Sequence, residues 1–237
     1  MNIPVLSGIG ICQRSHDDGR ILLQETDFQL MAGARVAISG ASGAGKSVFL
    51  RTISLLDLPA AGKLYRNGEL VQLNAISIGQ HRSQIAYVSQ KPVLVPGTIL
   101  DNLQLPYTLN RYKQKNFDAK LSQQIFNDLG KDKNFLERET TDLSGGEAQL
   151  VCLLRILQLN PLVLLLDEPT ASLDETSARF VQKLLNQWQQ ENPKAAYLWI
   201  SHSEQQVYEV ADEVWYFDAG KFTHSKQLQQ KEGHHAD

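Results

Sequence analysis

A glycine-rich run near the start of the chain constrains the fold more than any other feature. It reads GASGAGKS at residues 40–47, between a short β-type stretch at 34–39 and a helical pattern at 48–55. Its three glycines permit backbone turns that a Cβ would block, so successive N–H groups can close around a phosphate. The order of strand, loop and helix also directs a helix N-terminus at that anion. The run therefore predicts an α/β domain built around a phosphate-binding loop.

The residues of this loop divide into side-chain and backbone ligands. We expect Lys46 to bring a positive charge to the β and γ phosphates of a nucleotide, and Ser47 to offer its hydroxyl to Mg²⁺. The other members of the loop contribute backbone groups: Gly40, Ala41, Ser42, Gly43, Ala44 and Gly45. A chance glycine turn before a helix is the alternative, and the flanking strand and helix argue against it.

Composition narrows the class of protein. The chain has 237 residues, 42% of them hydrophobic, and a formal net charge of −3, which fits a globular protein with a substantial core. No run approaches the ~18 apolar residues of a membrane helix, and residues 1–11 lack a signal-peptide pattern. We therefore expect a cytoplasmic protein, one that can sit on a membrane partner.

The slightly negative net charge argues against nucleic acid as a partner. Cys12 and Cys152 are expected to be free thiols.

The patterning along the chain predicts two regions. Residues 3–38 alternate apolar and polar side chains and predict an antiparallel β lead-in, whereas helical periodicity dominates from 91 to 160. We expect one domain over 1–237, with its core in 1–90 and 161–237 and a helical subdomain inserted at about 91–160.

An apolar strand that ends in two carboxylates supplies a second group of candidate residues. Leu164–Leu166 is followed directly by Asp167 and Glu168, and ligands gather at the carboxyl ends of strands in open α/β sheets. Asp167 is expected to hold Mg²⁺, and Glu168 to polarise a water aimed at the γ-phosphate. A strand followed by a polar turn is the alternative, which the upstream phosphate-binding loop makes the weaker one.

The run LSGGE at residues 143–147 predicts a second phosphate-binding surface. Ser144 can cap the helix that follows, and Gly145 and Gly146 leave the first N–H groups of that helix open. Two such surfaces on one chain suggest that two chains share nucleotides.

Together these motifs resemble the ATP-binding subunit of an ABC transporter. They appear in the order of that family: Walker A at 40–47, the Q-loop glutamine at Gln90, the signature at 143–147, Walker B at 162–168, the D-loop at Ser172–Asp174 and the switch histidine at His202. The resemblance implies a P-loop NTPase fold with a mixed sheet, an antiparallel β lead-in and an inserted helical subdomain. It also implies ATP and Mg²⁺ as ligands, with Gln90 near the metal and Asp174 near the nucleotide.

The family further implies a mechanism and partners. Glu168 is the general base, His202 contacts the γ-phosphate and Lys46 completes the catalytic set. Two copies bury ATP between the loop of one copy and Ser144–Gly146 of the other. A permease docks near Val93–Pro106, which places the chain peripherally on the cytoplasmic face of the inner membrane.

Some positions depart from the family pattern. Residues 1–27 contain no aromatic residue to stack on adenine, so Arg14 or His16 is expected to cover the base. Glu147 replaces the more frequent signature glutamine, Leu150 stands where arginine is usual, and Ser203-Glu204 follows the switch histidine without the common aspartate. None of these changes removes a catalytic group.

The amino-acid sequences of several segments, GTILDNLQLPY among them, are similar to those of the small Fet-type (YbbL-like) ATPases assigned to iron export. Phosphate-import and lipoprotein-release ATPases are the alternatives within transport. ABC ATPases of DNA repair or the ribosome form another class, but they usually have long insertions or two ATPase halves, and here each motif occurs once.

Overall fold

The computed structural model describes residues 3–228 and divides the chain into two compact units. The first unit comprises the chain up to Tyr87, Pro161–Glu168 and the residues from Asn192 onward; the second comprises Val88–Asn160 and Pro169–Glu191. This division differs from the expected one at 169–191, which the sequence assigned to the core.

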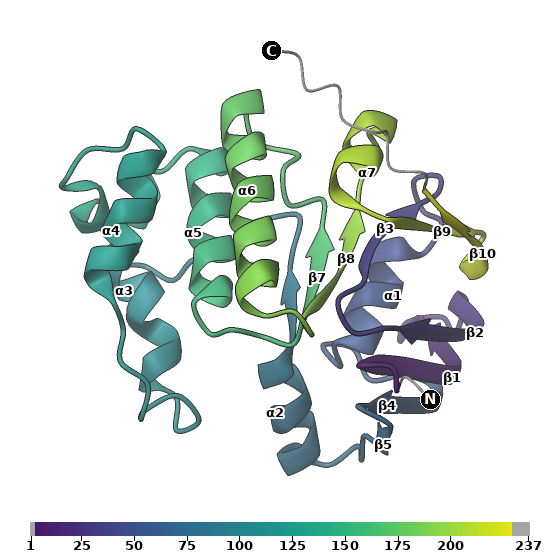
Figure 1. The fold of residues 1–237 in the computed structure, drawn as a ribbon. Coiled ribbons are helices and arrows are strands. Elements are labelled where there is room, and N and C mark those ends of the chain that lie inside the picture. The colour runs from purple at the N-terminus through teal and green to yellow at the C-terminus, as the bar shows by residue number, and fades with distance from the viewer. Residues whose placement is uncertain (1–2, 229–237) are drawn as a thin grey trace. The chain divides into compact units, whose positions relative to one another are not determined.

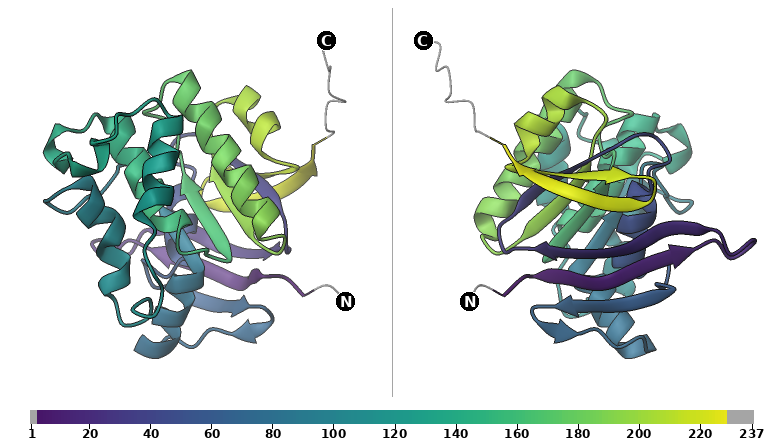
Figure 2. Two further views of the ribbon diagram at one scale, coloured as in Figure 1. Left: turned by 60° about the vertical axis from the view of Figure 1, so that its left-hand side comes forward. Right: turned by 90° about the vertical axis from the view of Figure 1, so that its right-hand side faces the viewer.

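Two sheets make up the first unit (Figure 1). The smaller sheet has the order β2-β1-β4-β5, and its strands are β1 (Leu6–Arg14), β2 (Ile21–Leu30), β4 (Ala61–Arg66) and β5 (Glu69–Leu70). All its pairings are antiparallel, and β1, β2 and β4 run side by side in Figure 2. The antiparallel lead-in is thereby confirmed. Strands β4 and β5 are joined by a tight turn at Asn67-Gly68, where both residues have positive φ, 50° and 79°.

The larger sheet has the order β10-β9-β3-β8-β7-β6. Its strands are β3 (Arg35–Ser39), β6 (Ile85–Val88), β7 (Val163–Asp167), β8 (Ala196–Ile200), β9 (Glu213–Asp218) and β10 (Lys221–Gln227). Strand β3 pairs in parallel with β8 and β9, β7 pairs in parallel with β8, and β10 closes one edge antiparallel to β9. Every residue of β7 and β8 is buried, as continuous apolar strands in a covered parallel sheet should be. The predicted mixed α/β fold is confirmed.

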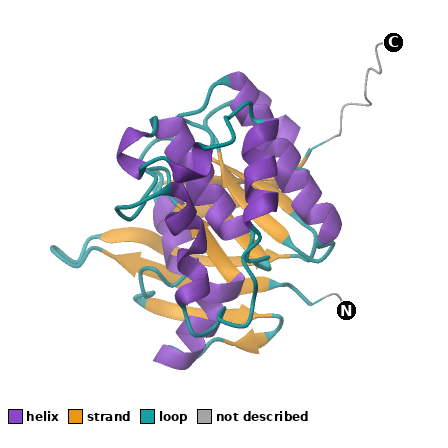
Figure 3. Ribbon diagram, turned by 90° about the vertical axis from the view of Figure 1, so that its left-hand side faces the viewer, coloured by secondary structure: helices purple, strands orange, loops and turns teal. Residues whose placement is uncertain are grey.

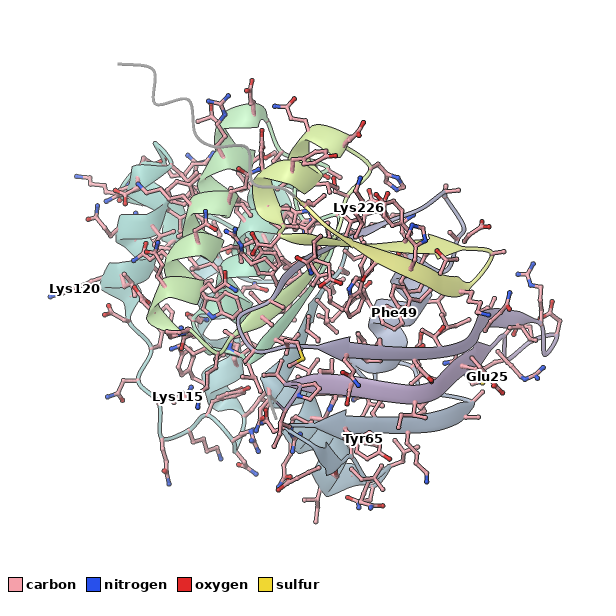
Figure 4. The ribbon with its side chains drawn as sticks, turned by 45° about the vertical axis from the view of Figure 1, so that its right-hand side comes forward. Glu25, Phe49, Tyr65, Lys115, Lys120 and Lys226 are labelled. Atoms are coloured by element: carbon pink, nitrogen blue, oxygen red, sulfur yellow. The ribbon has the colours of Figure 1, made fainter. Side chains whose placement is uncertain are left out.

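Helix α1 (Lys46–Ile53) links the two sheets through an aromatic cluster. The ring of Phe49 lies 5.1 Å from that of Phe28 on β2 and 4.9 Å from that of Phe217 on β9. Figure 4 shows Phe49 between the β9–β10 hairpin and the antiparallel sheet. Because Phe49 is fully buried, the helix that follows the glycine-rich loop is fixed to both sheets.

Helices α2 (Ala75–Gln84) and α7 (Glu204–Val210) were not predicted. Helix α2 is polar, with a single buried residue, so its sequence lacks an apolar stripe. Its only local signal is Asn74, whose side chain accepts a hydrogen bond from the Ser77 N–H.

The second unit is built from helices (Figure 3). They are α3 (Ile99–Gln104), α4 (Ala119–Asp128), α5 (Gly145–Leu157) and α6 (Glu175–Glu191), with short 3₁₀ segments η1 (Leu105–Thr108), η2 (Phe135–Glu137) and η3 (Thr140–Asp142). Helix α6 lies beside α5 in Figure 1. Phe180, Leu184 and Trp188 of α6 line one hollow together with residues of α4 and α5, which explains why 169–191 groups with this unit. No helix within 3–228 combines the length and apolar character that a bilayer span requires.

Candidate functional site

The glycine-rich loop of the first unit connects β3 to α1 and is open at the helix start. Gly45 occupies the N-cap of α1 with a φ of 91° and offers no side chain to the first N–H groups. A Cβ on Gly40 would lie 2.2 Å from the Phe217 carbonyl oxygen, and one on Gly45 would lie 3.0 Å from Gly220 Cα. Only glycine therefore lets the loop approach β9 and the β9–β10 turn this closely, which leaves the α1 N–H groups available to an anion.

Lys46 lies folded into this loop. Its Nζ donates hydrogen bonds to the carbonyl oxygens of Gly40 and Ala41, at 2.8 and 2.9 Å, and its side chain is almost fully buried. Burial lowers the pKa of Lys46, while the nearby carboxylates of Glu168 and Asp167 act in the opposite direction. A buried ammonium held by two neutral carbonyls is suited to exchange them for a charged anion.

Asp167 is a buried carboxylate of the first unit. It lies at the end of β7 and accepts hydrogen bonds from Ser47 Oγ at 3.0 Å and from Tyr87 OH at 2.8 Å. The Ser47 hydroxyl and the Asp167 carboxylate are hard oxygen ligands of the kind that Mg²⁺ prefers. Ser47 and Asp167 therefore meet in the structure, and their binding of Mg²⁺ stays a prediction.

Glu168 follows Asp167 in a strained backbone conformation, with a φ of 49°. The turn directs its side chain toward His202, whose Nε2 lies 3.0 Å from Glu168 Oε1. Non-glycine residues rarely adopt this conformation, and such strain is concentrated at functional sites. Glu168 and His202, which come from distant segments of the sequence, are thus in contact.

The signature segment of the second unit forms the start of α5. Ser144 caps the helix: its Oγ accepts from the Glu147 N–H, and Glu147 accepts in return from the Ser144 N–H. A Cβ on Gly146 would lie 3.0 Å from the Ser172 carbonyl oxygen, whereas one on Gly145 would meet no atom within 4 Å. Gly146 thus packs against the 172–174 loop, and Gly145 faces a small hollow of about 220 Å³ that this loop also lines.

Comparison with known proteins agrees with this geometry. A family model described as "ABC transporter" matches residues 23–171. The chain is 33% identical over 186 residues to the probable iron export ATP-binding protein FetA of Escherichia coli (78% of this chain, 80% of FetA). It is 34% identical over 186 residues to the lipoprotein-releasing system ATP-binding protein LolD of Myxococcus xanthus (77% and 82%).

Among solved structures, the ATP-binding cassette MJ0796 in a dimeric post-hydrolysis state bound to ADP and Pi superposes with a TM-score of 0.82. It covers 94% of this chain and 99% of its own, at 23% identity, which indicates a shared fold. The chain belongs to the ABC transporter family. It is an ATP-binding, ATP-hydrolysing subunit of that family, as the motifs predicted.

The remaining predicted residues of this ABC ATPase lie in the second unit. Gln90 follows β6 in an exposed position, beside Ser89, whose carbonyl accepts a hydrogen bond from Gln149 of α5. Asp174 precedes α6 and accepts hydrogen bonds from the N–H and the hydroxyl of Ser177, which lower its pKa. The expected approach of Gln90 to the metal and of Asp174 to the nucleotide stays a prediction.

One residue of the ABC ATPase site was missed from the sequence, and one predicted residue, Arg14, lines a hollow of the first unit. Tyr87, on β6, was not predicted. Nothing in the local sequence pattern of β6 links it to Asp167, which lies at the end of β7, much later in the chain. Burial, together with the hydrogen bond to Asp167, raises the pKa of Tyr87 and keeps it a donor. Arg14 lines a hollow of about 330 Å³ next to Gln24 and Lys221, and no aromatic residue lines that hollow within the described chain.

Proposed function

We propose that this ABC ATPase powers a separate membrane permease, and that two copies bind ATP between them. The observation that supports the proposal best is that one chain presents two distinct helix N-termini suited to phosphate. One is α1 after the glycine-rich loop, and the other is α5 at the signature. The dimeric state of MJ0796 supports the same arrangement for this chain.

Binding begins at the loop of the first unit. Lys46 Nζ leaves the carbonyls of Gly40 and Ala41 and pairs with the β and γ phosphates, while loop N–H groups donate to the same oxygens. Ser47 and Asp167 would hold Mg²⁺, with Gln90 as a further oxygen ligand. When bound, this metal supplies positive charge that offsets the charge developing on the phosphates.

Hydrolysis uses the pair at the end of β7. Glu168 takes a proton from a water molecule as the water oxygen bonds to the γ-phosphorus, and the bond from that phosphorus to the β–γ bridging oxygen breaks. His202 orients the Glu168 carboxylate through the 3.0 Å contact, and we assign it a contact with the γ-phosphate in the ATP state. The products are ADP and inorganic phosphate.

The permease contact is proposed for Val93–Pro106. The backbone of this segment is anchored, because the Val93 carbonyl accepts from Arg155 Nη2 at 2.7 Å and Val95 exchanges hydrogen bonds with Asn102. The side chains of Val93 and Val95 nevertheless remain 68% and 38% exposed. A fixed backbone that presents apolar side chains is suited to hold a partner helix. The chain would then be peripheral on the cytoplasmic face of the inner membrane.

Iron is the first transport substrate to test, because FetA is named as a probable iron export protein and aligns over most of both chains. Lipoprotein release is the second candidate, since LolD is as similar. The substrate pocket of such a system belongs to the permease.

The replacement Glu168→Gln tests the proposal. It keeps the shape of the side chain and removes the base, so ATP still binds while turnover falls by roughly 10²- to 10⁴-fold. Size-exclusion chromatography with ATP should then reveal a trapped dimer. Turnover at the wild-type rate would refute the assignment of Glu168.

A further inference from the structure

A salt bridge within the second unit ties the signature to the end of α4. Lys131 Nζ lies 2.8 Å from Glu147 Oε1, and the other Glu147 oxygen accepts the Ser144 N–H at 2.9 Å. The Glu147 side chain is only 15% exposed. A single carboxylate thus connects the helix cap of the signature to a cation from another element.

The α4 terminus holds Lys131 in place. Gly130, with a φ of 73°, donates its N–H to the Asn127 carbonyl, and the Lys131 N–H donates to the Phe126 carbonyl. This is the Schellman pattern of helix termination. The Lys131 ammonium also lies 5.5 Å from the centre of the Phe135 ring. Both backbone and side chain therefore fix the position of the charge.

The charges around the signature hollow are unbalanced. Its described lining includes two carboxylates, Glu147 and Asp174, and one cation, Lys131. Burial acts to raise the pKa of Glu147, but the hydrogen bonds from Lys131 and Ser144 outweigh it and leave that pKa below its ordinary value. Glu147 is thus ionised at neutral pH, next to N–H groups that would have to receive an anion.

We propose that Lys131 is a positioning residue for the second phosphate-binding surface: it neutralises Glu147 and holds it in the helix cap, so that the α5 N-terminus can accept a partner-bound phosphate. The inference rests on the proposed shared ATP site. Without Lys131, the carboxylate of Glu147 repels the incoming γ-phosphate, because the hollow then contains two anions and no cation.

The experiment measures ATP-dependent dimerisation of the full chain by sedimentation, in the Glu168→Gln background. Lys131→Met should weaken dimerisation about tenfold, the size expected for a charged hydrogen-bonded partner. Lys133→Met removes an exposed charge two residues away and serves as the matched control, with no change expected.

The decisive arm is the double variant Lys131→Met, Glu147→Gln. Glutamine still accepts in the capping box and has no charge, so the double variant should dimerise within about twofold of Glu147→Gln alone. Lys131→Arg should also retain dimerisation, and it keeps the test available if Lys131→Met does not fold. ATP affinity of the monomer, measured by a fluorescent ATP analogue, should be the same in all variants.

Two results would overturn the inference: dimerisation of Lys131→Met equal to that of Lys133→Met, or a loss that Glu147→Gln does not restore. A loss in Lys131→Arg as large as in Lys131→Met would do the same. Failure of the shared-site proposal is distinguished by Ser144→Arg. If Ser144→Arg dimerises in the Glu168→Gln background, and hydrolyses ATP like the wild type when Glu168 is intact, the proposed function is wrong whatever Lys131 does.

Discussion

Among single residues, His81 shows most clearly how burial controls protonation. It lies in α2, is fully buried, and its Nε2 donates to the Ile53 carbonyl at the end of α1, 2.8 Å away. Its Nδ1 has no hydrogen-bond partner within residues 3–228. Burial lowers the pKa of His81 to about 4, so the native state keeps the ring neutral.

This depressed pKa predicts a pH-dependent stability. The unfolded chain protonates His81 first as the pH falls below 6.5, so the free energy of unfolding decreases between about pH 6.5 and 4, by roughly 3 kcal/mol in total. Urea unfolding at several pH values measures it. The decrease in the free energy of unfolding between pH 6.5 and 4 that is due to His81 should be absent in His81→Gln. It should remain in the control His16→Gln, which replaces an exposed histidine. An unchanged pH slope in His81→Gln would contradict the assignment.

At the scale of elements, most of the fold could be predicted from patterns, and the exceptions have physical causes. The buried strands β7 and β8 and the glycine-rich loop follow from local composition. Helix α2 does not, because its sequence has no apolar stripe. The grouping of α6 depends on side chains of α4 and α5 that local periodicity does not reveal. Ser47, Asp167, Glu168 and His202 were predicted singly as site residues. Their contacts in pairs, and the contact of Tyr87 with Asp167, required the three-dimensional structure.

The loop between β3 and α1 gives a prediction at this scale. Gly40→Ala would place a Cβ 2.2 Å from the Phe217 carbonyl oxygen and should destabilise the chain by more than about 1 kcal/mol while reducing ATP affinity. Gly79→Ala on α2 is the control, because its Cβ meets no atom within 4 Å and the φ of Gly79 is not positive. Thermal unfolding and ATP titration compare the two. Equal behaviour would show that the approach to β9 does not shape the loop.

At the scale of the whole molecule, the two proposed phosphate-binding surfaces give each chain half of two ATP sites, and the apolar Val93–Pro106 segment gives it a contact to a permease. ATP binding and permease binding are separable by mutation, because the first depends on polar residues of the glycine-rich loop, β7 and the signature, and the second on exposed apolar side chains.

The permease contact predicts a specific loss. Val95→Asp places a charge in an apolar contact, so it should abolish assembly with the permease and transport but spare ATP hydrolysis by the isolated subunit. Leu121→Asp, at an apolar position on α4 that is 57% exposed, is the control and should assemble normally. A pull-down with a parallel ATPase assay measures both. Full assembly of Val95→Asp would exclude this segment as the contact.

The shared ATP site is tested most directly by mixing two inactive variants. Lys46→Ala should lose ATP affinity, since the phosphates lose their side-chain cation. Ser144→Arg should bind ATP as a monomer but fail to close on a partner loop that holds ATP, because arginine fills the space that the phosphates need at the helix start; the empty loop of Lys46→Ala leaves that space free. Each alone should be inactive. In a mixed dimer, the loop of the Ser144→Arg copy faces the intact signature of the Lys46→Ala copy. We therefore predict that mixing restores ATP hydrolysis from one of the two sites. A mixture that stays as inactive as its components, or either variant hydrolysing ATP alone at the wild-type rate, would contradict the account.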